Sequence, residues 1–173
     1  HEHGMQHVTI ATWGRESMLD QTKNYGDFPR MMKYFDMPGN EDSKESGPNG
    51  AFIDTKMSSS MAHINGKSRV AVCAYWGMGW GFTQDENIAR TNLNYALGIN
   101  LFNAHGVLYS LQGGRNEWVP PETHFYQPYW KTWRSFTDHV SRLSYPLSQG
   151  RHCADVALVY PLSTIHAGWH SGS

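Results

Sequence analysis

Apolar and polar positions along the chain form short β-rich runs separated by longer segments with helical spacing. The clearest run is residues 70–75, which is apolar and leads into a cluster of glycines and tryptophans. A helix signal follows at once, because Thr83 and Glu86 have the spacing of a capping box, in which each side chain satisfies a free N–H group. We therefore predict a buried strand, a glycine-rich turn and a helix that continues to Leu97.

The first part of the chain carries weaker signals. Residues 7–13 read as a strand, and residues 28–35 suit a short helix with Pro29 at its first position. Residues 36–39 read as a short strand that enters a loop. The following segment, residues 40–50, is rich in Ser, Gly, Asp and Glu, and we expect an exposed loop there.

Helical spacing returns at residues 51–64, where apolar side chains recur on one face and Gly66 fits a C-terminal cap. After the central strand and its helix, residues 98–105 predict another strand. The clearest helix is residues 130–147, with one apolar face that we assign to the core. Residues 154–160 are almost entirely apolar, which predicts a strand buried on both faces.

The predicted elements alternate between strands and helices along the whole chain. This alternation indicates an α/β fold with a largely parallel sheet. No phosphate-binding loop or zinc motif is present, and the glycines at 77, 79 and 81 do not have the dinucleotide-binding spacing. We therefore expect no cofactor, although calcium stays open, with Glu41 and Asp42 as candidate ligands.

Composition narrows the function classes. The net charge of -1 and the lack of a basic stripe argue against nucleic-acid binding, and no apolar run is long enough to span a membrane. Aromatic residues make up 13% of the chain, which is typical of proteins that handle carbohydrates. Cys73 and Cys153 both fall in predicted buried strands, so we expect buried free thiols, with a disulfide as the alternative.

Candidate chemistry gathers where the predicted strands end, which is where α/β barrels place their acids, bases and ligands. Glu16 follows the first strand, Glu41 opens the polar loop and His105 ends the strand at 98–105. Each has a plainer alternative: Glu16 could pair with Arg15 or cap a helix, Glu41 could be solvated, and His105 could be packed. The aromatic side chains near strand ends could bind a flat or sugar-like ligand or only fill space.

The first residues raise a separate hypothesis. His1 could bind copper through its amine and ring as a histidine brace does, and His3 stands at the third position of a terminal metal chelate. We favour a frayed or junctional terminus.

Several stretches taken together resemble a known enzyme family. They are Tyr34–Gly39, Ser58–Lys67 with Arg69 and Val70, Gly79–Thr83, Gly98–His105, Tyr126–Trp130, Arg142–Arg151 and Ala154–Pro161. In this order they resemble large bacterial α-L-rhamnosidase-like glycoside hydrolases, family 106 and its relatives, from about Trp13 to Tyr160. The resemblance implies the last strands of a (β/α)8 TIM-barrel-like catalytic domain, partial or rearranged, at residues 1–150. It implies a strand opening a further domain, plus a tail, at residues 151–173.

The resemblance also implies a pocket with two carboxylic groups, one acid and one base, at the carboxyl ends of the strands. Glu16 and Glu41 are the matching carboxylates in this chain. Relatives usually carry a glutamate at the place of Cys73 or Ala74, so this sequence departs from the pattern there. The expected substrate-binding residues are Tyr75, Trp76, Trp80, His105, Tyr126 and Trp130.

We therefore predict a secreted or periplasmic glycoside hydrolase that acts on an oligo- or polysaccharide. A non-catalytic carbohydrate-binding fragment is the main alternative, because of the missing glutamate and the many tryptophans. The copper enzyme built on His1 is the third reading. A partial barrel would leave sheet edges open, so self-association is expected.

Overall fold

The structure is a computed structural model, and it describes residues 3–10, 22–23, 25–43, 47–107, 110, 112 and 123–168. Its elements follow the order of the chain. They are α2 (Phe28–Met32), β1 (Gly39–Ser43), α3 (Gly47–Ile64), β2 (Ala71–Trp76), α4 (Gln84–Ala96), β3 (Leu101–Ala104), η2 (Trp130–Thr132), α6 (Trp133–Leu147) and α7 (Leu162–Gly168). Among these described elements, no helix is both long and apolar enough to cross a membrane.

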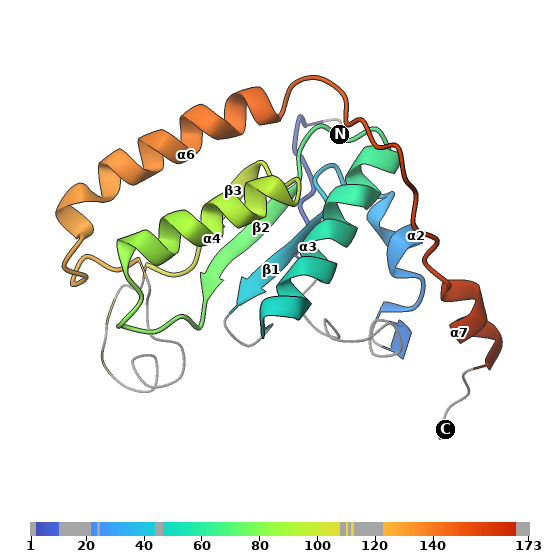
Figure 1. The fold of residues 1–173 in the computed structure, drawn as a ribbon, viewed down its shortest axis with the longest axis horizontal. Helices are drawn as coiled ribbons and strands as arrows, with labels where there is room; N and C mark the ends of the chain where they lie inside the picture. Colours follow the sequence, from blue (N-terminus) through green and yellow to red (C-terminus); the bar gives the residue numbers. More distant parts are fainter. Residues whose placement is uncertain are drawn as a thin grey trace.

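The three strands form one parallel sheet in the order β1-β2-β3 (Figure 1). The β1–α3–β2–α4–β3 sequence makes two βα crossovers, so the fold is mixed α/β and compatible with part of a barrel. A segment before α2 runs parallel to the entry of β1, where Val8 forms an isolated bridge with Met37. The predicted strand at 7–13 is seen only as this bridge, and its second half lies outside the described residues.

Side chains alternate between the two faces of the sheet, and the register shows which share a face. Asn40, Val72 and Phe102 form one row across the three strands, and the helices cover this side. Asn40 donates to the Thr55 hydroxyl of α3 at 3.0 Å, and the ring of Phe102 meets Tyr95 of α4. We call this side the helix face, and Figure 1 shows α3 and α4 lying along it.

The main core lies on the helix face of β2. Val72 and Ala74 are fully buried there, together with Ala62 of α3 and Phe136 of α6. The predicted apolar face of residues 130–147 is confirmed at Phe136, with Trp133 and Val140 packed at the margin of the cluster. The predicted helix begins as the short 3-10 helix η2 and ends one residue after Pro146.

Helix ends follow the sequence signals. Thr83 and Glu86 make the full capping box of α4, with the Glu86 carboxylate accepting the Thr83 backbone N–H at 2.7 Å. Asp27 caps α2 by accepting the Arg30 N–H at 2.9 Å, and Pro29 lies in the first turn. Gly66 closes α3 with a φ of 65°, a conformation that costs glycine little.

The prediction of an exposed loop from residue 40 is wrong. Residues 39–43 form β1, and Asn40, Glu41 and Asp42 are all buried. The strand is buried although its sequence is polar, because the Asn40 amide nitrogen bonds Thr55 of α3 and the Asp42 carboxylate pairs with Arg90 of α4.

The prediction of a strand buried on both faces at residues 154–160 is also wrong. These residues form no described ladder, and Val156, Leu158 and Val159 are strongly exposed. Cys153, expected to be buried, is an exposed free thiol. The end of the segment packs on the described part of the chain, where Tyr160 contacts a second small core around Met32 of α2. Apolar character alone therefore does not bury a segment whose partners the described chain does not supply.

Candidate functional site

The parallel strands end at one edge of the sheet, and this carboxyl edge carries the candidate site. Glu41 of β1 is the Cα partner of Cys73 in β2, and Cys73 is the partner of Asn103 in β3. All three therefore lie on the face opposite the helix face, in one row. With strands about 4.8 Å apart, the row spans roughly 10 Å between the outer Cα atoms. Glu41 is 8% exposed, Cys73 is half-buried and Asn103 is exposed.

Two aromatic side chains follow this row toward the edge. Trp76 ends β2 and meets the imidazole of His105 edge-on, with ring centroids 6.2 Å apart. The His105 backbone N–H donates to the Ala74 carbonyl at 2.9 Å, which extends the β2–β3 ladder to the imidazole. Both rings are half-buried. An indole and an imidazole thus come from the ends of β2 and β3, while the Glu41 carboxylate comes from the middle of the neighbouring strand β1.

Tyr75 does not join them. Its backbone adopts a φ of 71°, which is rare for a side chain of this size and is typical of positions held in place by their surroundings. The ring is 1% exposed, and its hydroxyl lies 2.6 Å from the Thr91 hydroxyl of α4. Burial raises the pKa of Tyr75, so the phenol stays protonated. Tyr75 is therefore a core residue under α4 and leaves the set of ligand-contacting candidates.

Exposed rings gather in the turns beyond β2 and beyond β3. Trp80, Phe125 and Tyr126 are 37%, 47% and 66% exposed, and we call them the aromatic surface. They surround His124, which is buried and contacts all three rings at centroid distances of 3.8 to 6.2 Å. Sequence reasoning found Trp80 and Tyr126 but missed His124 and Phe125, although the continuous run His-Phe-Tyr was visible.

Trp130 lies apart from the aromatic surface in its ring contacts. It begins η2 and stacks on Trp133, with centroids 6.4 Å apart and planes 10° from parallel. Trp133 in turn packs against the main core. Trp130 is half-buried, so this indole anchors the start of α6 and presents only part of its surface to a ligand.

Asp42 is engaged by α4. Both its carboxylate oxygens accept the Arg90 Nε–H, at 2.7 and 2.9 Å, and one also accepts the Asn94 amide at 2.9 Å. Its side chain is 2% exposed. The candidate calcium ligand is therefore an ion-pair partner that fixes the end of β1. Across the described ranges, no group of three or more His, Cys, Asp or Glu side chains could hold a metal ion.

Two predicted site residues lie outside the described residues. They are Glu16, the second candidate carboxylate, and His1, the candidate copper ligand. Their roles stay predictions. The family resemblance implies a glutamate at Cys73 or Ala74, and these two positions lie on opposite faces of the sheet. Cys73 shares the face of Glu41, whereas Ala74 is fully buried in the core of the helix face.

No family model matches this sequence, and no curated protein matches it. Among solved structures, a rhamnosidase from Novosphingobium sp. PP1Y is similar in fold, with a TM-score of 0.56 over 72% of this chain and 20% sequence identity. The match spans 13% of that much longer chain. The likeness establishes a related arrangement of strands and helices, equivalent to a small part of the larger enzyme.

Proposed function

We propose that this chain contributes the carboxyl-edge wall of a glycoside hydrolase site, with Glu41 as one of its two carboxylic groups. The observation that carries the proposal is the row of Glu41, Cys73 and Asn103 across one face of a parallel sheet, with Trp76 and His105 following it toward the carboxyl edge. In barrel enzymes this edge holds the chemistry. The fold likeness to a rhamnosidase supports a glycosidase origin.

The environment of the Glu41 carboxylate suits general acid–base catalysis on a glycosidic bond. Its side chain is almost buried, as the catalytic carboxylates of glycosidases often are. Asn103 on the same face supplies an amide that can hydrogen-bond sugar hydroxyls. Trp76 and the aromatic surface offer flat apolar faces of the kind that pack on sugar rings.

Hydrolysis requires a second carboxylic group, about 5–5.5 Å from the first in retaining enzymes and about 6.5–9.5 Å in inverting ones. Glu16 is the candidate in this chain. The described segment before it supports the assignment, because Val8 bridges Met37 in parallel and the chain there runs in the same direction as β1. The described segment, residues 3–10, therefore runs toward the carboxyl ends of the strands.

The decisive experiment measures hydrolysis of a panel of aryl glycosides and polysaccharides by the chain and by Glu41→Gln, an isosteric change. General acid–base catalysis contributes about 10²–10⁴-fold, so we expect a rate loss of that order. Asp138→Asn on the exposed face of α6 is the matched control and should keep full activity. Equal rates for Glu41→Gln and the parent chain would refute the role of Glu41.

The Cys73 position allows a gain-of-function test. Cys73→Glu places a second carboxylate directly beside Glu41 on the same face, where the family resemblance implies one. We expect the variant to hydrolyse substrate faster than the parent if the missing glutamate limits activity. The matched change Ala74→Glu points into the fully buried core and should destabilise the chain instead.

The aromatic surface favours a second candidate function, sugar binding without turnover. Three exposed rings around one buried imidazole form a platform that needs no carboxylate. Trp80→Ala should then abolish oligosaccharide binding measured by calorimetry. Tyr145→Ala, which removes a 68% exposed ring from α6, should leave it unchanged. Binding that survives Trp80→Ala would exclude this platform as the binding surface.

A further inference from the structure

We propose that a cleft at the amino edge of the sheet binds a multivalent oxyanion, a sulfate or phosphate group. The cleft lies before the amino ends of β2 and β3, and Trp76 and His105 lie at the other end of these strands, so it does not depend on the proposed hydrolase site. Two adjacent cavities of about 300 and 550 Å³ share six lining residues. The shared residues, which we call the basic cleft, are His63, Lys67, Ser68, Gly150, Arg151 and His152.

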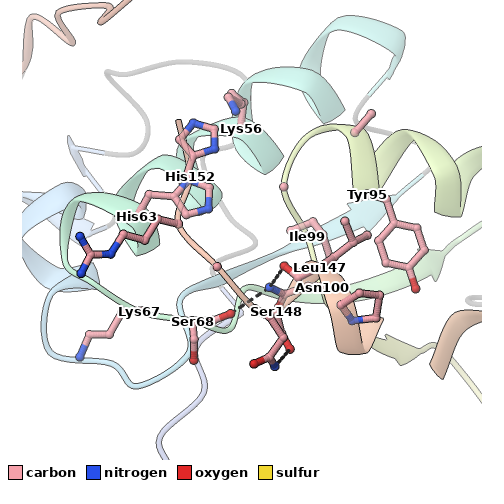
Figure 2. Close-up of a pocket in the computed structure, with 16 residues that line it drawn as sticks. Lys56, His63, Lys67, Ser68, Tyr95, Ile99, Asn100, Leu147, Ser148 and His152 are labelled. Carbon is pink, nitrogen blue, oxygen red and sulfur yellow. Dashed lines mark hydrogen bonds between the residues drawn. The ribbon is translucent and has the colours of Figure 1, made fainter. Parts of the chain in front are cut away.

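The charge of the lining has one sign. Lys56, Lys67 and Arg151 contribute three cations, and two imidazoles add to them. No aspartate or glutamate lines either cavity, although the chain as a whole has a net charge of -1. Within the described part of the chain, none of the three cations forms an ion pair with a carboxylate. Figure 2 shows Lys56, Lys67 and the two imidazoles around the same hollow.

The walls of the cleft are tied together by one side chain. The amide of Asn100 donates to the Ser68 carbonyl at 2.9 Å and to the Leu147 carbonyl at 3.2 Å (Figure 2). Its oxygen accepts the Val70 N–H at 2.9 Å. Three segments far apart in sequence, after α3, before β3 and at the end of α6, are thereby held in fixed positions. A pre-formed cleft loses less entropy on binding than a flexible one.

The negative ends of helix dipoles at the cleft disfavour an anion, and their partial charge can be compared with that of the cations. The C-terminal ends of α3, α4 and α6 all reach the cleft, and each carries about half a negative charge, roughly -1.5 in sum. Backbone donors already cap these ends, as the Lys67 N–H does for Ala62 and the Gly98 N–H for Tyr95. The three cations therefore outweigh the helix ends by about 1.5 charges.

Two imidazoles of the basic cleft lie against each other. His63 and His152 stack with ring centroids 4.1 Å apart and planes 10° from parallel. Burial lowers the pKa of His63, and His152 and Lys56 lower it further, with no counter-charge among the residues that line the cavity. A bound oxyanion would supply that counter-charge and favour protonation. By linkage, the anion should then bind more tightly at pH 6 than at pH 8.

The test uses the whole chain and inorganic sulfate and phosphate, with chloride at matched ionic strength. Imidazole resonances of His63 and His152 are followed by NMR while each anion is added at pH 6 and pH 8. We expect saturable shifts with sulfate or phosphate and none with chloride. Sulfate, whose charge is the same at both pH values, should bind more tightly at pH 6. A sulfated oligosaccharide and a phosphorylated one then distinguish which ester the cleft prefers.

The double variant Lys67→Gln/Arg151→Gln removes two cations of the basic cleft and should weaken binding by at least about tenfold. The matched double variant Lys131→Gln/Arg142→Gln removes two exposed cations that line neither cavity and should bind normally. Shifts that rise without saturation, or equal binding by the two double variants, would overturn the proposal.

Discussion

The ion pair between Asp42 and Arg90 should be far more sensitive to loss of the arginine than to loss of the aspartate. The Asp42 side chain is 2% exposed, whereas that of Arg90 is 24% exposed. Arg90→Met leaves a buried carboxylate whose remaining described donor is the Asn94 amide. Removing one partner of a buried pair costs about 3–5 kcal/mol, because the other charge is left uncompensated. Such a loss is a large part of the roughly 5–15 kcal/mol that stabilises a domain.

Asp42→Asn should cost less, about 1–2 kcal/mol, because the guanidinium of Arg90 can turn toward water. The double variant Asp42→Asn/Arg90→Met should lose less free energy of unfolding than the two single variants lose in sum, since it leaves neither charge unpaired. Urea unfolding of the four proteins at pH 7 measures all three quantities.

The chain provides its own control pair. Arg134 and Asp138 form an ion pair on α6 with side chains 87% and 50% exposed. Arg134→Met should change the free energy of unfolding by less than about 0.5 kcal/mol. If Arg90→Met costs no more than this control, or no more than Asp42→Asn, the argument from unequal burial fails.

Two further outcomes test the packing and the titration described above. In a thermal unfolding assay, Gly39→Ala should destabilise the chain by at least about 1–3 kcal/mol, because its Cβ would lie 2.6 Å from the Ala71 carbonyl oxygen. The control Gly81→Ala, whose Cβ meets nothing within 4 Å, should be nearly neutral. Equal effects of the two variants would contradict the close approach of β1 and β2. The lowered pKa of His63 means that its neutral form is favoured in the folded chain, so stability should be full above about pH 6.5 and fall as the pH drops below it. His63→Gln should flatten this decline in melting temperature between pH 7.5 and pH 5, whereas His139→Gln on α6 should not, and an unchanged decline in His63→Gln would exclude this imidazole as its source.

Local signals in the sequence located the elements that are stabilised by local hydrogen bonds or by an apolar face. The strand β2, the capping box of α4 and the apolar face of α6 were predicted because each follows from spacing and residue type. The boundary of α3 was placed within a few residues for the same reason. These features need no knowledge of which distant segments meet.

Elements whose partners are distant were not predictable. β1 has the sequence of a polar loop, and its burial depends on Thr55, Arg90 and Asn94, which lie 15 to 52 residues away. The segment 154–160 shows the reverse, since its apolar side chains find few partners within the described chain. In the candidate site, Glu41 was a candidate from its place after a predicted strand and from the resemblance, but its alignment with Cys73 required the strand register.

The order of the strands in the sheet is also their order in the chain. Gly39 pairs with Ala71, and Ala71 with Leu101, so consecutive partners are only 32 and 30 residues apart. During synthesis on the ribosome, each new strand therefore meets a neighbouring strand that has already emerged. The helix between the two strands in sequence packs on the face of the sheet that they form. Closing loops of this length costs little additional entropy for each unit added. The βα units of this chain can accordingly assemble one after another as they are translated, and the β3 edge is where a further unit would be added.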